Sequence, residues 1–347
     1  MQAWAAALAP LPHGYAFFAL DLDQGVSFEL HGPDGPLWIE ADLAPDPGFA
    51  RTRRLRLTHQ PHALTARQRQ VLAHAVARLQ ALDDGLWPTP GEAEPAVRHV
   101  RADRVLVTSP NLPTDYAINP YIGCTIGCQF CNARFRADDV RALDGRAPRP
   151  WGAWIDAKVD APEVLAREVQ TVRPGSVCFS PVITDPYVGV ERRLELTRSC
   201  LQVLATAGFS AAVLTRSSLV LRDFDALAQL PAAAVGVSLP TEDPQLLERI
   251  EPRGATQAER LAILDSARAA GLRTFAVVQP AYPRNASALA ELLACRVDAV
   301  RVDGLHEAGR VGHLFQGVEL ADPAEVERAF TALGVPTDLE AVLRFSN

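Results

Sequence analysis

Three of the six cysteines lie within eight residues of one another, at a spacing typical of a metal-binding loop. Cys124, Cys128 and Cys131 form a Cys-x3-Cys-x2-Cys pattern directly after a short apolar run. Gly123 and Gly127 give this backbone the freedom to wrap around a cluster. Three thiolates can ligate three irons of a [4Fe-4S] cluster and leave the fourth iron open. The amino and carboxylate groups of S-adenosylmethionine could chelate that iron, so that one electron would break a carbon–sulfur bond and release an adenosyl radical.

Zinc is the alternative metal, since thiolates bind it equally well, but a structural zinc site needs a fourth ligand. No histidine lies between His99 and His306 in the sequence. An all-cysteine site would need one of the remaining cysteines, Cys178, Cys200 or Cys295. Cys200 and Cys295 are better explained by helix packing, because a buried thiol behaves as a small hydrophobe. The pattern therefore favours a cluster with one open iron over zinc.

The cysteine loop, with the aromatic Phe130 just before its third cysteine, resembles the radical S-adenosylmethionine (SAM) superfamily. The core of that superfamily is a partial (β/α) barrel. More narrowly, residues 117 to about 285 resemble the spore photoproduct lyase-related group. The narrower resemblance rests on the motifs Ile118-Asn-Pro-Tyr-Ile-Gly-Cys124, Thr184-Asp-Pro-Tyr187 with Glu191 and Thr197-Arg198, Leu214-Thr-Arg-Ser217 with Arg222-Asp223, Val237-Ser-Leu239, and Ile250-Glu-Pro-Arg253 with Arg260.

The resemblance implies roles for residues at the carboxyl ends of the strands, where barrel enzymes keep their sites. Thr184 and Asp185 would meet the amino group or ribose of SAM. Arg216, standing where relatives often have Lys, and Ser238 would reach its carboxylate or ribose. A zwitterion with a sugar suits one acid, one base and small hydroxyl groups. The residues expected to contact the cofactor are Phe130, Thr184, Asp185, Glu191, Arg216 and Ser238.

The same residues have plainer explanations. Asp185 could cap the turn before Pro186, and Arg216 could be a surface charge. Glu191 and Arg260 could be ion partners on a helix surface, where such pairs contribute little to stability. The sequence leaves both explanations open for each of these residues.

Two differences from spore photoproduct lyase itself bear on the substrate. That enzyme is characterised by tyrosines beside the last cluster cysteine and by a hydrogen-donating cysteine shortly before the acid of the second strand. Here Phe130 and Asn132 flank the last cysteine, and Val182 stands three positions before Asp185. Cys178 shares the side-chain parity of that position but lies further back. It is a weak candidate for a radical relay, with core packing as the alternative, and splitting of a thymine dimer by the known relay is not expected.

Strands that alternate with amphipathic helices follow the cysteine loop and must position these residues. Such alternation predicts parallel pairing with helices outside. Gly208 and Gly271 are expected to end two helices, since each directly precedes a strand candidate. With a first strand leading into Tyr121, about six βα units are expected, which is an incomplete barrel. The strand candidates are Ser176–Ile183, Ala211–Thr215, Ala233–Leu239, Arg273–Val278 and Val297–Val302.

The first 96 residues have a different character. Thr65 is a candidate N-cap for a helix whose apolar face would be formed by Leu72, Val76, Leu79 and Leu82. A proline-rich stretch at residues 87–95 suits a linker. Turn sequences separate strand candidates at Tyr15–Leu22, Val26–Leu30 and Leu37–Leu43.

These elements predict an α/β protein in three parts. A small N-terminal α+β domain at residues 1–96 would serve substrate or partner recognition. A partial (β/α)6 TIM-like barrel at residues 97–310 would hold the cluster and SAM. Residues 311–347 would form a C-terminal helical tail.

Composition narrows the classes of partner. A net charge of −7 argues against strong non-specific binding to nucleic acid. The arginines at residues 51–56 are expected on the solvent-exposed face of a strand, where charged side chains are common. The N-terminal residues lack a basic segment before an apolar run, and no run of about 18 apolar residues occurs. We therefore expect a cytoplasmic protein with no membrane contact.

These observations favour a radical SAM enzyme that abstracts a hydrogen atom from an unknown small molecule or peptide. It would need a low-potential electron donor of the flavodoxin or ferredoxin type. Two alternatives remain open: repair or modification of nucleic-acid lesions, and a non-catalytic iron–sulfur protein for electron transfer or sensing. The loop at Gln279–Asn285 departs from the expected relatives, which suggests a changed substrate.

Overall fold

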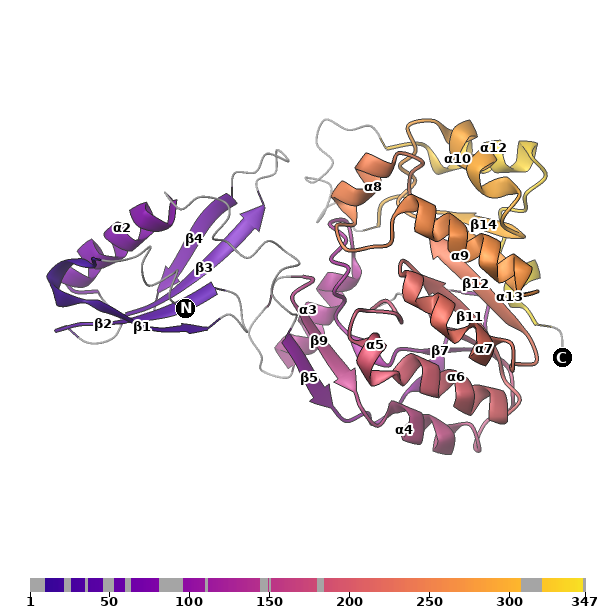
Figure 1. Ribbon diagram of the computed structural model, residues 1–347, viewed down its shortest axis with the longest axis horizontal. Helices are drawn as coiled ribbons and strands as arrows, with labels where there is room; N and C mark the ends of the chain where they lie inside the picture. The colour runs from indigo at the N-terminus through magenta and orange to yellow at the C-terminus, as the bar shows by residue number, and fades with distance from the viewer. Residues whose placement is uncertain are drawn as a thin grey trace. The chain divides into compact units, whose positions relative to one another are not determined.

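A computed structural model of the chain is shown in Figure 1. It describes residues 10–21, 26–34, 37–45, 53–59, 64–80, 96–109, 112–143, 149, 151–179, 184–306 and 320–345. The chain divides into two compact units, residues 1–96 with 145–153 and residues 97–144 with 154–347. Within the described ranges, no helix has the length and apolar character needed to span a membrane.

The first unit combines an antiparallel four-stranded meander with one long helix. Its strands pair in chain order, as consecutive strands joined by short turns do. The Gln68 N–H donates to the Thr65 hydroxyl at 3.1 Å, and the Thr65 N–H donates to the Gln68 side chain at 3.0 Å. This capping box starts the helix. The elements are η1 (Pro12–Gly14), β1 (Ala16–Asp21), β2 (Val26–His31), β3 (Leu37–Pro45), β4 (Arg53–His59) and α2 (Ala66–Gln80).

The capping box confirms the predicted N-cap at Thr65. The buried face of α2 begins with Val71 and Ala75, whereas Leu72 is only half-buried, so the predicted helical face is displaced by one residue. The side chains of the other predicted face residues, Val76, Leu79 and Leu82, lie outside the described residues, as do the linker at 87–95 and the side chains of the arginines at 51–56.

The second unit is built on a seven-stranded sheet. Six strands pair in parallel in the order β7-β10-β11-β12-β13-β14, and β6 pairs antiparallel with β7. Among the described residues no pairing joins β14 to β6, so the sheet is open and the fold is mixed α/β. The strands are β6 (Leu106–Thr108), β7 (Tyr116–Ile118), β10 (Ser176–Phe179), β11 (Ser210–Thr215), β12 (Ala233–Ser238), β13 (Arg273–Val278) and β14 (Ala299–Val302).

The first parallel strand differs from the prediction. It ends at Ile118, and Tyr121 belongs instead to β8 (Tyr121–Ile122), which pairs with β9 (Trp154–Lys158) in a separate three-stranded sheet with β5 (Ala96–Val100). The other predicted strands are found within two residues at their described ends. The last four residues of the predicted strand at 176–183 lie outside the described residues.

Helices cover one face of the parallel sheet (Figure 1). Gly208 and Gly271 follow α6 and α9 with φ of +75° and +74°, the left-handed conformation that ends helices, so both predicted stops are confirmed. The helices are α3 (Ala133–Leu143), α4 (Ala161–Glu168), α5 (Glu191–Leu194), α6 (Leu196–Thr206), η3 (Ser218–Asp223), α7 (Phe224–Leu227), α8 (Pro244–Ile250), α9 (Gln257–Ala269), α10 (Ala286–Ala294), α12 (Pro323–Ala332) and α13 (Glu340–Leu343).

The two faces of the sheet carry different side chains. The helix-covered face is rich in Val and packs against helix leucines in the main core. The opposite face, called here the inner face, carries small residues such as Ala117, Ala212 and Ala234. At Gly236 an added Cβ would lie 2.3 Å from the Phe275 ring, so that ring fills the space a side chain would take. This apolar layer lies below the carboxyl ends of the strands.

The C-terminal segment packs against both faces of the sheet. Val326 and Phe330 of α12 are fully buried in the main core. Leu339, Val342 and Leu343 belong to the inner-face cluster, and the Val300 N–H donates to the Pro336 carbonyl at 2.8 Å. These helices contribute to the core of the second unit.

The packing of α12 predicts a large effect of truncating Phe330. Phe330→Ala should lower the free energy of unfolding by about 3–5 kcal/mol, since it removes a fully buried ring and leaves a cavity. Leu333, which ends the same helix and is 48% exposed, is the matched control, and Leu333→Ala should change it by less than about 1 kcal/mol. Urea unfolding monitored by circular dichroism measures both. Equal losses would contradict this account of the C-terminal segment.

Candidate active site

The cysteine loop runs from β8 to α3 and is shaped by two glycines. Gly123 has φ +84° and Gly127 φ +70°. At Gly123 an added Cβ would lie 2.7 Å from the Trp154 carbonyl oxygen and 2.8 Å from its ring. No other residue fits there without displacing the backbone of β9. Cys124 and Cys128 are buried and Cys131 is partly buried, so the loop carries its thiols inward.

The three thiols influence one another through their charges. Burial, together with the charges of Asp185 and Cys131, raises the pKa of Cys124 to about 12. Burial likewise raises the pKa of Cys128 and Cys131, while the Arg216 guanidinium opposes the rise in both. Three neighbouring thiolates are therefore unstable by themselves and need bound cations to replace their protons. Iron supplies such cations, so the donor set fits an iron–sulfur cluster.

A single metal ion would need its ligands gathered around one point, which a cluster of several irons does not. In the part of the chain that the structure describes, no three His, Cys, Asp or Glu side chains gather around a point where one ion could lie.

The predicted cofactor acid, Asp185, is buried beside the loop with its oxygens bonded to protein. Its Oδ1 accepts from the Thr215 hydroxyl at 2.7 Å and the Tyr187 N–H at 2.8 Å, and its Oδ2 accepts from the Arg216 N–H at 2.8 Å. Burial raises its pKa, and these three donors act in the opposite direction. The bond from Tyr187 caps the turn around Pro186, as the plainer explanation expected. A contact of Asp185 with SAM stays a prediction.

Arg216 is no surface charge, so that explanation is wrong. Its side chain is 12% exposed, and its Nε lies 2.7 Å from Glu251 Oε1. Its guanidinium carbon lies 5.8 Å from the centroid of the Phe130 ring, within reach of a cation–π contact. Phe130 itself is buried. The structure thus brings two predicted cofactor residues together beside the cysteines.

Arg260 is also no surface residue. Its side chain is fully buried, with Nη2 at 2.5 Å from Glu251 Oε2 and Nη1 donating to the Ser238 carbonyl at 2.5 Å. Burial alone would raise the pKa of Glu251, but Arg260 and Arg216 hold it below its ordinary value. Arg216, Glu251 and Arg260 therefore form one ion-paired chain, called here the Arg–Glu–Arg chain.

The small predicted cofactor residues are buried at the same edge of the sheet. Ser238 is 1% exposed, and its hydroxyl donates to the Val277 carbonyl at 3.4 Å. Thr184 is 2% exposed, and its hydroxyl donates to the Asp185 carbonyl at 3.2 Å. Their contacts with SAM stay predictions.

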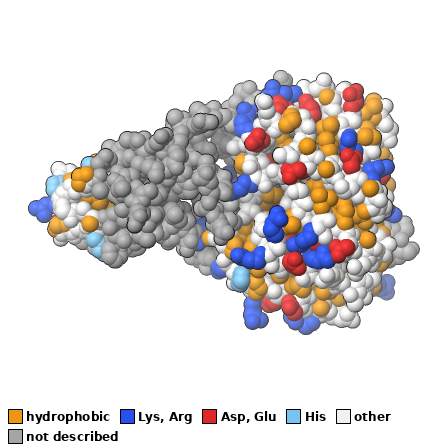
Figure 2. All heavy atoms as spheres, in the orientation of Figure 1, with side chains coloured by type: hydrophobic (Ala, Val, Ile, Leu, Met, Phe, Trp, Pro, Cys, Tyr) orange, Lys and Arg blue, Asp and Glu red, His pale blue; other side chains and the backbone are white. Residues whose placement is uncertain are grey.

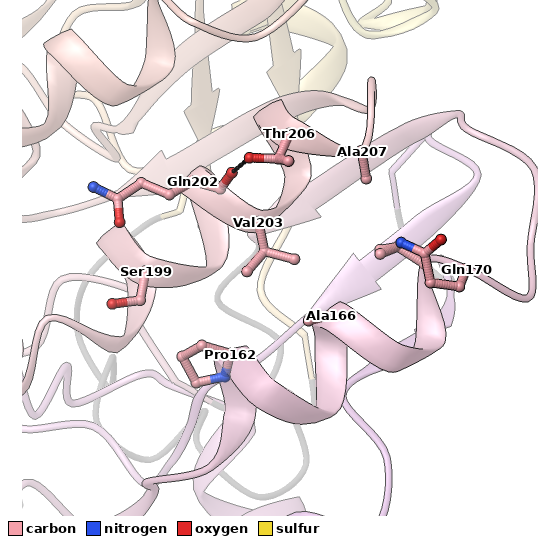
Figure 3. Close-up of a pocket in the computed structure, with 9 residues that line it drawn as sticks. Pro162, Ala166, Gln170, Ser199, Gln202, Val203, Thr206 and Ala207 are labelled. Carbon is pink, nitrogen blue, oxygen red and sulfur yellow. Dashed lines mark hydrogen bonds between the residues drawn. The ribbon is translucent and has the colours of Figure 1, made fainter.

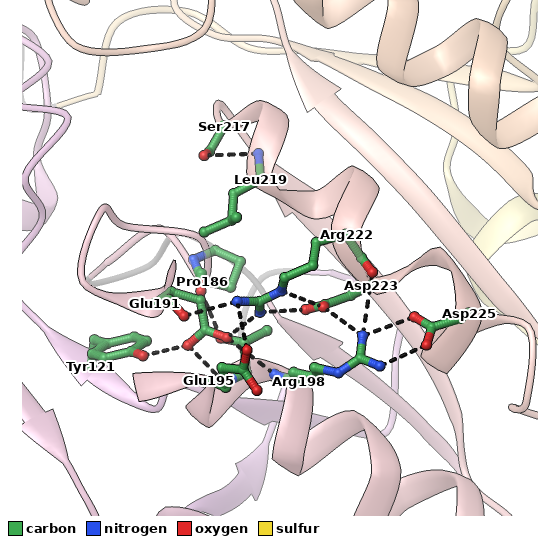
Figure 4. A network of polar contacts seen from close by, with 11 residues as sticks. Tyr121, Pro186, Glu191, Glu195, Arg198, Ser217, Leu219, Arg222, Asp223 and Asp225 are labelled. Carbon is green, nitrogen blue, oxygen red and sulfur yellow. Dashed lines mark hydrogen bonds and ion pairs between the residues drawn. The ribbon is translucent and has the colours of Figure 1, made fainter. Parts of the chain in front are cut away.

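Glu191 is fully buried at the centre of a polar network, so the helix-surface explanation is wrong for it too (Figure 4). Its carboxylate accepts hydrogen bonds from the Tyr121 hydroxyl, the Thr197 N–H at 3.0 Å, the Arg198 N–H at 3.2 Å and Arg222 Nη2 at 2.8 Å. Burial raises its pKa, and these donors oppose the rise. Glu191 ties the strand before the cysteine loop to α6 and η3, and its contact with SAM stays a prediction.

The remaining cysteines lie in three different settings. Cys200 is fully buried in the main core, which confirms its packing role. Cys295 is exposed after α10, so its predicted packing role is wrong. Cys178 is 1% exposed on the inner face, with its Sγ 3.6 Å from the Ser109 hydroxyl oxygen. Val182, which stands where spore photoproduct lyase would have its hydrogen-donating cysteine, lies outside the described residues.

A shallow groove lies elsewhere, between α4 and α6 on the helical layer (Figure 3). None of the predicted site residues lines it. Its lining residues are Pro162, Ala166, Val169, Gln170, Ser199, Gln202, Val203, Thr206 and Ala207.

Sequence reasoning gave no role to Glu251 or Arg253, although both lie in one of the motifs. Arg253 lies close enough to the thiols that Cys124 and Cys128 affect its pKa, which burial lowers and their charges raise. The signal was Gly254, where an added Cβ would lie 2.5 Å from Arg260 Nη2. The glycine leaves room for the close approach of the buried Arg260 side chain.

Comparison with known proteins gives matches over the same region. The family model described as the Radical SAM superfamily matches residues 118–293. An uncharacterized protein of Mycobacterium tuberculosis is 31% identical over 211 residues, covering 57% of this chain. An uncharacterized protein of Methanocaldococcus jannaschii is 29% identical over 168 residues, covering 48% of this chain. The chain covers 61% of the length of each of these relatives.

Two solved structures are also similar to this chain. A spore photoproduct lyase complexed with dinucleoside spore photoproduct has a TM-score of 0.49 at 16% identity, covering 71% of this chain and 79% of that one. SuiB of Streptococcus suis bound to S-adenosylmethionine has a TM-score of 0.42 at 15% identity, covering 63% of this chain and 46% of that one.

The close approach at Gly123 predicts a specific mutational effect. Gly208 has a similar φ, but an added Cβ there meets nothing within 4 Å, so Gly208→Ala should cost about 1–2 kcal/mol of unfolding free energy for the left-handed backbone. Gly123→Ala should cost a further ~1–3 kcal/mol because of the clash with Trp154. Chemical denaturation of both variants measures the difference. Equal losses would show that β9 yields freely and that the loop is not held as described.

Proposed function

This chain belongs to the radical SAM superfamily, and we propose that it is an enzyme that abstracts a hydrogen atom from its substrate after reductive cleavage of SAM. Members of the superfamily are enzymes, and membership implies a [4Fe-4S] cluster and SAM. The observation that carries the proposal is the set of three neighbouring cysteines on a loop turned by two positive-φ glycines.

Cys124, Cys128 and Cys131 would hold the cluster. When bound, the cluster would supply the electron that breaks the carbon–sulfur bond of SAM. The buried setting of the loop keeps water from the thiolates, and the Gln129 N–H, which donates to the Ile250 carbonyl at 3.0 Å, anchors the loop between its second and third cysteines. These contacts support a loop shape that is held before the cluster binds.

The SAM site that we propose lies at the carboxyl ends of β10, β11 and β12. Arg216 would bind the carboxylate of SAM, because its guanidinium lies 5.8 Å from the Phe130 ring, beside the third cysteine. Asp185 would hold the Arg216 backbone in place through its 2.8 Å bond to the N–H. Thr184 and Ser238 would offer hydroxyls to the amino group or ribose. Glu191 would position the start of the cysteine loop by accepting the hydrogen bond from the Tyr121 hydroxyl.

We also propose that the six parallel strands form a partial (β/α)6 barrel and that the substrate enters over its inner face. The buried cluster that contains Phe275 and Val277 would close the site from below. The N-terminal domain at residues 1–96 would present the substrate or a partner. The electron donor would be of the flavodoxin or ferredoxin type.

A small molecule or peptide is the substrate class that we propose. A thymine-dimer relay through Cys178 is not favoured, because its thiol is 1% exposed and packs beside Ser109. On the face shown in Figure 2, positive and negative side chains are interspersed on the second unit. The described residues on that face form no continuous positive surface for nucleic-acid phosphates.

The proposal predicts cleavage of SAM by the anaerobically reconstituted protein. With a strong low-potential reductant, the wild type should convert SAM to 5′-deoxyadenosine and methionine. Cys124→Ala, Cys128→Ala and Cys131→Ala should each reduce 5′-deoxyadenosine formation by at least about 100-fold, because a missing ligand disrupts the cluster that membership implies. Liquid chromatography with mass spectrometry measures the product.

Cys200→Ala is the matched control, since its thiol lies in the main core. It should retain the cleavage activity and alter only the stability of the protein. A reduced wild-type cluster that leaves SAM intact would instead favour an electron carrier or sensor.

A further inference from the structure

The Arg–Glu–Arg chain places three charges in a nearly dry setting. The side chains of Arg216, Glu251 and Arg260 are 12%, 0% and 0% exposed. Glu251 bridges the two guanidiniums at 2.7 and 2.5 Å. Buried charges of this kind are costly, and a hydrophobic set of similar volume would often be as stable. Stability alone is therefore a weak reason for three charges at this place.

The chain is attached to the cysteine loop at a defined point. Ile250, which directly precedes Glu251, accepts the Gln129 N–H at 3.0 Å. The Arg216 guanidinium lies 5.8 Å from the ring of Phe130, the residue after Gln129. Gln129 and Phe130 are the two residues between the second and third cysteines. The charges of Arg216 and Glu251 are thus held at a fixed position beside the loop.

The two charges act on the cysteines with opposite sign. Arg216 carries a positive charge and lies against the Phe130 ring. Glu251 carries a negative charge and directly follows Ile250, which accepts the Gln129 N–H. Both charges therefore lie beside the two residues that join Cys128 to Cys131, and opposite charges act oppositely on a nearby negative centre. A negative centre at these sulfurs is therefore stabilised by Arg216 and destabilised by Glu251.

Reduction of an iron–sulfur cluster adds one negative charge at the same place. Nearby charge, hydrogen bonding and exposure set the reduction potential of such clusters. In a low-dielectric setting an unscreened charge has a larger effect than an exposed one, which solvent and salt screen. A carboxylate beside the cluster lowers its potential, and a guanidinium raises it.

We propose that Glu251 and Arg216 set the reduction potential of the cluster in opposite directions, with Arg260 holding the Glu251 carboxylate in position through their ion pair. This inference rests on the proposed function, because it requires a cluster on the three cysteines. It gives the buried ion pair a purpose in the reaction: Glu251 keeps the bound cluster reducing enough to cleave SAM, and Arg216 limits how far the potential falls.

The test is the midpoint potential of the reconstituted full-length protein without SAM, measured by a redox titration followed by electron paramagnetic resonance. Glu251→Gln should raise the potential, because it removes a negative charge. Arg216→Gln should lower it, because it removes a positive charge. The double variant should return close to the wild-type value. Glu248→Gln and Arg136→Gln, which make the same changes at exposed residues, should leave it unchanged.

A second comparison does not depend on the folding of Glu251→Gln. Arg216→Lys keeps the positive charge and should keep the wild-type potential, whereas Arg216→Gln should lower it with the same iron and sulfide content. If the pair has only a structural role, Glu251→Gln and Arg216→Gln should shift the midpoint potential in the same direction or leave it unchanged. Either result would overturn the inference.

The failure of this inference is distinguishable from that of the proposed function. A wild-type protein that binds no iron–sulfur cluster, or a cluster that leaves SAM intact, would count against the proposed function. A wild-type cluster that cleaves SAM but whose potential does not respond oppositely to the two substitutions would overturn this inference alone.

Discussion

Two hydrogen bonds, each to a buried acidic residue or its direct neighbour, hold the cysteine loop from its two sides. Glu191 accepts the hydroxyl of Tyr121 on the strand before the loop, and Glu251 follows Ile250, whose carbonyl accepts the N–H of Gln129 within the loop. A buried carboxylate is tolerated only where donors surround it, since an unpaired one costs several kcal/mol. Movement of Tyr121 would deprive the Glu191 carboxylate of a donor, and movement of Gln129 would break its bond to the residue before Glu251. The shape of the loop is thus coupled to α5 and α8.

The parallel sheet brings the other site residues to the same edge. Asp185 precedes α5, Arg216 follows β11 directly, and Ser238 ends β12. Because parallel strands all end at one edge, residues far apart in the chain meet there. The inner face below is filled by small residues and by Phe275 over Gly236. The sheet therefore presents polar groups above a closed apolar layer.

Local charge at the site differs from the charge of the whole chain. The net charge is −7, yet the Arg–Glu–Arg chain carries two positive groups for one negative group beside the cysteines. Burial strengthens these charges relative to those on the surface. A zwitterionic cofactor, and a cluster whose charge changes on reduction, both respond to the charges buried beside the cysteines. The net charge of the whole chain has little influence on them.

The sequence by itself determined the features that depend on near neighbours in the chain. The capping box at Thr65 and the helix ends at Gly208 and Gly271 follow from local hydrogen bonds and backbone conformation, and the cysteine spacing is likewise local. Only the tertiary structure decided which charged residues are buried. Arg260 has the polarity of a helix-surface residue, but the Ser238 carbonyl reaches it from 22 residues away in the sequence. Exposure depends on which distant segments pack over a side chain, and the pattern of neighbours along the chain does not contain that information.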